Sequence, residues 1–122
     1  MYLEKSINMK KDEFKEWLQI RFSDKKTTVS NRISNCKNVE KYYGDLGTHF
    51  IKNKCSSIMG ELKYTIEDER ARKPQRHKVP INGKIRTGSA TLKQAVKLYV
   101  EFREHQAELA ATQMSPDKSN LD

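Results

Sequence analysis

The stretch that decides the fold is "SDKKTTVSNRISNCKNVEKYYG", residues 23–44. Its apolar side chains recur every three or four residues, which places them along one stripe of a helix: Val29, Ile33, Cys36, Val39 and Tyr43. Thr27 or Thr28 can cap the start, and Gly44 can adopt the positive φ that often ends a helix. We therefore predict a helix that buries one face against other elements.

Three more segments with helical periodicity precede Pro74. They cover residues 10–22, residues 45–54 and residues 56–72. In the last of them Ser56 or Ser57 is the expected cap, and the acidic tract 67–69 is expected on the solvated face. Pro74 ends this helix because proline cannot continue it.

Between Pro74 and the next periodic segment the chain carries turn signals. Pro74 and Pro80 exclude a helix there. Asn82 and Gly83 stand between two isoleucines, which is typical of a type I′ turn and predicts a minimal hairpin.

A last long helix is expected over residues 90–109, with Ser89 as its N-cap and Leu109 on its inner side. We expect a flexible C-terminal tail at residues 111–122, where the periodicity stops. The predicted fold is an all-α single domain over residues 1–110. It is a small orthogonal bundle of four to five helices with a basic loop or minimal hairpin before the last one.

The charge is unevenly distributed along the 122 residues. Lys and Arg number 24 against 16 Asp and Glu, a formal net charge of +8. Residues 73–97 carry seven basic side chains and no acidic one, whereas residues 98–122 carry two basic and five acidic ones. A local excess of this kind favours a polyanionic partner.

No catalytic or metal-binding motif stands out. His49, His77 and His105 lack motif partners, and adjacent carboxylates in the tract 67–69 splay apart on a helix. We therefore expect no enzymatic activity, no cofactor and no metal.

The two cysteines, Cys36 and Cys55, lack ligand spacing and fall at apolar positions, so they are expected to be buried free thiols. A disulfide between them stays open. No apolar run approaches membrane-spanning length and no leader-like segment begins the chain, so we expect a soluble cytoplasmic protein.

Two helix starts combine basic and hydroxyl side chains, a combination suited to phosphate contacts because helix N-termini attract anions. Asn31 and Arg32 could also reach base edges. The alternative is that both clusters are ordinary solvated surface. The candidate nucleic-acid-binding residues are Lys25, Lys26, Thr28, Asn31, Arg32, Arg76, Lys78, Lys84, Arg86, Thr87, Ser89, Lys93 and Lys97.

Two stretches, "EFKEWLQIRFSDKKTTVSNRISNCKNVEKYYG" and "GSATLKQAVKLYVEF", resemble the SAM-like core-binding N-terminal domain of tyrosine recombinases, the phage integrases. Residues 55–102 also resemble an uncharacterised bacterial and mobile-element segment found next to nuclease modules. The first resemblance implies a helical domain that clamps one side of a DNA duplex through its backbone, and not strand exchange. The DNA-facing helix start would then carry Lys25, Lys26, Thr27, Thr28, Asn31 and Arg32.

These observations predict a non-enzymatic protein that binds double-stranded DNA mainly through the phosphate backbone, of phage or mobile-element type. Two alternatives remain. The chain could be an adaptor or inhibitor that binds an acidic protein, such as a DNA-processing host protein, through its basic face. It could also be a regulatory part of a larger nuclease assembly. The sequence leaves the oligomeric state open.

Overall fold

The computed structural model describes residues 10–23 and 25–114, and every regular element in that part of the chain is a helix. The elements are α2 (Lys11–Arg21), α3 (Lys26–Tyr43), α4 (Leu46–Asn53), α5 (Ser56–Leu62), α6 (Ile66–Arg70) and α7 (Ile85–Met114). The all-α prediction is therefore confirmed.

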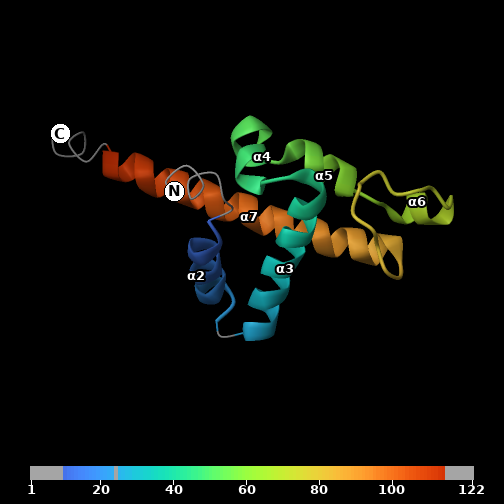
Figure 1. Ribbon diagram of the computed structural model, residues 1–122, viewed down its shortest axis with the longest axis horizontal. Coiled ribbons are helices and arrows are strands. Elements are labelled where there is room, and N and C mark those ends of the chain that lie inside the picture. The colour runs from blue at the N-terminus through green and yellow to red at the C-terminus, as the bar shows by residue number, and fades with distance from the viewer. Residues whose placement is uncertain (1–9, 24, 115–122) are drawn as a thin grey trace.

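Helix α7 is the axis of the molecule (Figure 1). It contacts α2, α3, α5 and α6, and α3 crosses it steeply. Helix α2 and the start of α3 lie on one side of α7, and α4 and α5 lie on the other (Figure 1). The C-terminal part of α7 extends beyond the other helices, which explains why Leu109, expected on the inner side, is half exposed.

The core forms where aromatic side chains of α2 meet those of α7. Phe14 packs edge-on against Tyr99, with ring centroids 5.5 Å apart, and against Phe102 at 5.3 Å. All three are buried, together with Leu18 and Val96. Burial of a side chain of this size stabilises the fold by about 1.5–3 kcal/mol. The apolar stripes predicted for α2 and for the first part of α7 are thus buried against each other.

The predicted helix over residues 56–72 is wrong in its extent, because it is two helices. Thr65 and Asp68 form a capping box that starts α6: each backbone N–H donates to the other residue's side chain, at 2.9 and 3.0 Å. Asp68, expected on the solvated face, is therefore buried. The expected caps at the starts of α3 and α5 are also absent, since Lys25 and Cys55 stand at those positions without side-chain cap bonds.

The segment before α7 contains no hairpin, since no strand occurs among the described residues. Gly83 takes a positive φ of 106°, and α7 begins two residues later at Ile85. Ser89, the expected cap, therefore lies inside the helix. The segment is held close to α7 at Gly88, where a Cβ atom would lie only 2.6 Å from Ile81 Cγ2. Ile81 thus packs against the helix backbone, and no second strand pairs with it.

The last helix also ends later than expected. Residues 111–114, expected in the tail, belong to α7, and residues 115–122 lie outside the described residues. In the described ranges no helix combines the length and the hydrophobicity needed to cross a membrane.

Replacing Gly88 with Ala should destabilise the protein by roughly 1–3 kcal/mol, because the new methyl group meets a branched, partly buried side chain. Urea unfolding measures this change. Gly60→Ala is the matched control, since nothing lies within 4 Å of its Cβ position in α5. That variant should gain about 0.5–1 kcal/mol of helix propensity. Equal stability changes in the two variants would contradict the packing argument.

Candidate functional site

A buried polar cluster around His77 holds the basic segment 73–84 against α7. The backbone N–H of Val79 donates to His77 Nδ1 at 3.2 Å, so that nitrogen is an acceptor and Nε2 carries the proton. Nε2 lies 2.8 Å from Ser89 Oγ. The Gln75 amide donates to the carbonyl oxygens of His77 and Val79 at 3.0 and 2.7 Å. The cluster therefore requires a neutral imidazole.

Tyr43, at the end of α3, anchors the same segment from the other side. The backbone N–H of Lys78 donates to its hydroxyl oxygen at 3.0 Å, and the hydroxyl donates to the Glu61 carboxylate. Burial, together with the bond to Glu61, raises the pKa of Tyr43 to about 12, so it stays a donor at neutral pH. The Lys78 ammonium also lies 5.1 Å from the centre of the tyrosine ring. The segment is therefore fixed to the end of α3, and the Lys78 side chain packs on the Tyr43 ring.

Several candidate residues in and after this segment are already paired. Arg76 lies 3.5 Å from the Asp68 carboxylate and donates to the backbone oxygen of Lys63 at 2.6 Å. Arg86 forms a 3.1 Å ion pair with Glu69. The predicted role of Ser89 at the surface is wrong, because its hydroxyl is buried against His77.

The remaining candidates differ in exposure. Six of them are exposed: Lys25, Lys26, Asn31, Lys84, Thr87 and Lys97. Thr28, Arg32 and Lys93 are half-buried. The Arg32 Nε atom is buried without a hydrogen-bond partner among the described residues, so its guanidinium does not lie freely on the surface.

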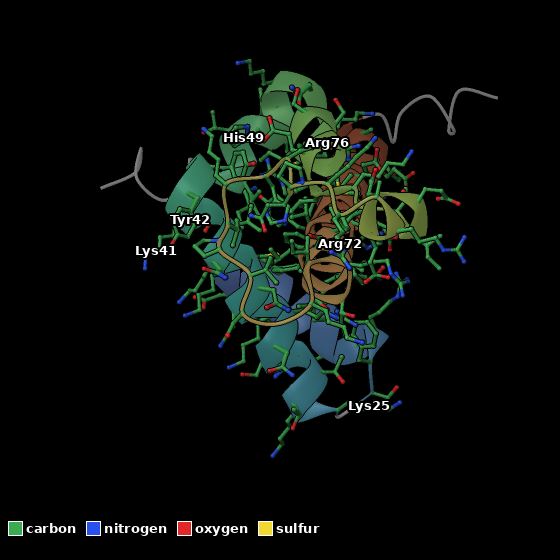
Figure 2. The ribbon with its side chains drawn as sticks, turned by 90° about the vertical axis from the view of Figure 1, so that its right-hand side faces the viewer. Lys25, Lys41, Tyr42, His49, Arg72 and Arg76 are labelled. Carbon is green, nitrogen blue, oxygen red and sulfur yellow. The ribbon has the colours of Figure 1, made fainter. Side chains whose placement is uncertain are left out.

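The two predicted clusters are spread over the molecule. Figure 2 looks onto the end where α7 begins, with Arg76 near the top, Arg72 in the centre and Lys25 at the lower edge. The first cluster, residues 25–32, lies at the start of α3. The second, residues 76–97, covers the segment between α6 and α7 and the first turns of α7. The α3 start, in turn, adjoins a feature that the sequence did not reveal.

That feature is a groove of about 740 Å³ between α2 and α3. It is lined by Lys11, Lys15, Gln19, Lys26, Val29, Ser30, Ile33, Ser34 and Lys37. Among the described residues, the lining thus contains four lysines, two hydroxyls and an amide, and no acidic residue. Among the predicted residues only Lys26 belongs to it.

Two lysines of the groove repel each other. Lys11 and Lys37 both line it, and the side-chain interaction and charge repulsion from Lys37 lower the pKa of Lys11. The carboxylate of Asp12 opposes this effect only in part. An anion bound between the two ammonium groups would relieve their repulsion.

The groove residues follow a helical pattern that was present in the sequence. Lys11, Lys15 and Gln19 are four residues apart on one side of α2. On α3 the row is formed at spacings of four, four and three by Lys26, Ser30, Ser34 and Lys37. The acidic residues of α2 fall between them and line other sides. A search for polar stripes, in addition to apolar ones, would have found both rows.

Within the described part of the chain, no group of three or more His, Cys, Asp or Glu side chains is placed to hold a metal ion. Cys36 and Cys55 are buried free thiols, as expected, and burial raises the pKa of Cys55 to about 12. No known family matches the chain, and neither does any curated protein or solved structure. The resemblance to integrase core-binding domains therefore stays a prediction.

The His77 cluster makes stability depend on pH. Burial lowers the pKa of His77 below its ordinary value of about 6.5, although the charge of Glu61 opposes this shift. The unfolded chain therefore takes up the proton first, so the stabilisation is complete above about pH 6.5 and is lost as the pH falls further.

At pH 7.5, His77→Gln should destabilise the protein by roughly 1–3 kcal/mol through the lost buried hydrogen bonds. The gap between the two proteins, measured by urea unfolding, should narrow as the pH is lowered to 5. Parallel curves for the two proteins over this range would show that folding does not lower the pKa of His77.

Proposed function

We propose that this chain is a non-enzymatic DNA-binding protein that holds the phosphate backbone of a duplex. The observation that carries the proposal is the groove between α2 and α3, whose described lining residues include four lysines and no acidic one. A polyanion that neutralises such lysines releases its own condensed counterions, which supplies most of the affinity in sequence-independent binding. The resemblance of residues 13–44 to integrase core-binding domains supports the same partner and a phage or mobile-element type.

The dimensions of the groove suit a nucleic-acid strand. Lys26 and Lys37 are eleven residues apart on α3, which corresponds to about 16 Å along a helix. One strand of a duplex carries a phosphate about every 3.4 Å along the axis, so about five phosphates pass over such a length. The four lysines of the groove could therefore neutralise most of them. The hydroxyls of Ser30 and Ser34 add neutral donors for phosphate oxygens.

The start of α3 extends this surface. Its N-cap residue, Lys25, makes no side-chain cap bond, and the first turn contains no acidic residue. Backbone N–H groups at such a helix start favour a phosphate. Lys84, Lys93 and Lys97 offer further contacts near the first half of α7, whereas Arg76 and Arg86 would first have to leave their carboxylates.

A salt titration tests the proposal. For a random-sequence duplex, log affinity should fall linearly with log salt, with a slope of about −0.9 per neutralised phosphate. The double variant Lys15→Gln with Lys26→Gln should bind more weakly at low salt and reduce the slope by about 2, because two phosphate contacts are lost. Fluorescence anisotropy across a salt series gives both values.

The control variant is Lys52→Gln with Lys63→Gln, which removes the same charge from exposed positions outside the groove. It should change the slope much less than the groove variant. Equal losses in the two variants would mean that net charge, and not the groove, is responsible, and a wild-type protein that ignores duplex DNA at low salt would refute the proposal.

One observation favours the alternative of an acidic protein partner. Ile20 follows the groove residue Gln19 directly and is 82% exposed. Protein interfaces combine apolar contacts with complementary charge, whereas a phosphate backbone gains little from an isoleucine. Purified protein that is free of nucleic acid by absorbance, and that ignores random duplex at about 50 mM salt, would favour this partner over DNA.

A further inference from the structure

The lysines of the α2–α3 groove are not evenly placed. Only a short connection, residues 22–25, joins the end of α2 to the start of α3, so the two helices run antiparallel and Lys26 lies near the turn. Lys11 and Lys37 are therefore both at the opposite end, where both side chains line the groove. That end of the groove carries two of its four lysines, and the interaction with Lys37 lowers the pKa of Lys11.

Two lysine ammonium groups at one end of the groove suit a phosphate monoester better than a phosphodiester. A phosphodiester within a strand carries a single negative charge. A phosphate monoester carries about −1.5 to −2 at pH 7 and has three strong acceptor oxygens. Each lysine offers three donors, and Ser34, three residues before Lys37, lines the same stretch of groove. The charge and the donors at this end exceed what one phosphodiester can neutralise.

Resting on the proposed function, we propose that the Lys11–Lys37 end of the groove binds a terminal phosphate monoester, such as the 5′-phosphate of a DNA end. The phosphodiesters that follow would lie along Lys15 and Lys26. The site would then prefer phosphorylated strand ends over internal backbone. A strand end would also contact Lys15 and Lys26, whereas a free phosphorylated small molecule would not reach them.

The test uses two blunt duplexes of one sequence that differ only in the 5′-phosphate, and a covalently closed circle that has no ends. The 5′-phosphorylated duplex should bind roughly three- to tenfold more tightly than the hydroxyl-ended one, as expected for one or two added exposed ion pairs. In the variant Lys11→Gln with Lys37→Gln this preference should fall to about one. The matched variant, Lys15→Gln with Lys26→Gln, should weaken both duplexes and keep the preference.

The outcomes separate the two proposals. If the circle and both linear duplexes bind equally, the monoester site is refuted while backbone binding stands. If no DNA binds, but inorganic phosphate shifts the side-chain NMR signals of Lys11 and Lys37, both proposals fail and the site takes a small phosphorylated ligand. A preference for the phosphorylated end that survives in Lys11→Gln with Lys37→Gln would also overturn the assignment. Unchanged thermal unfolding of each variant confirms that the exposed lysines were removed without loss of the fold.

Discussion

The structure depends on the burial of one face of α7 along its first half. Leu92, Val96, Tyr99 and Phe102 form the stripe on which α2, α3 and α5 pack, and α6 meets the same helix near its start. The helices that pack on α7 bury much of their apolar side there, while α2 and α4 also pack on α3. The positions of the groove and of the basic segment both follow from it, since α2 and α3 are held side by side by what they bury against α7 (Figure 1).

The basic segment 73–84 shows that positive charge in a sequence is not the same as free positive charge on a surface. The segment has four Lys and Arg residues and no acidic one. Its backbone is nevertheless fixed by His77 and Tyr43, and two of its side chains, Lys73 and Arg76, lie near the carboxylate of Asp68. Asp68 belongs to α6, a helix of five residues that the sequence pattern merged with its neighbour. The charge that had first suggested a polyanion is partly used within the fold.

The sequence predicted the elements that depend on apolar periodicity. Helices α2 and α4 were placed within one residue at each end, and Gly44 has the expected positive φ after α3, because these features are decided locally. Helix α3 begins two or three residues earlier than the expected caps at Thr27 or Thr28 implied. The sequence prediction failed where tertiary contacts decide. The start of α7 depends on the approach of Ile81 to Gly88, and the burial of Ser89 depends on His77, a residue twelve positions away. The groove requires two polar rows on separate helices to face each other, and no single segment contains that information.

Four arginines and some of the lysines, Lys54 and Lys73 among them, are engaged in contacts within the fold, whereas the four groove lysines form no ion pair with another described residue. Arg21, Arg76 and Arg86 pair with carboxylates, and Arg103 lies against the rings of Phe50 and Tyr99. A planar guanidinium suits such fixed contacts, whereas a lysine ammonium is strongly hydrated and is inexpensive to leave exposed. Among the described residues that line the groove, the charged ones are all lysines. An anion that enters it displaces water and counterions but breaks no ion pair among the described residues, whereas one that binds at Arg76 or Arg86 must compete with α6. For the proposed phosphate partner, the groove is therefore a less costly site than the two paired arginines.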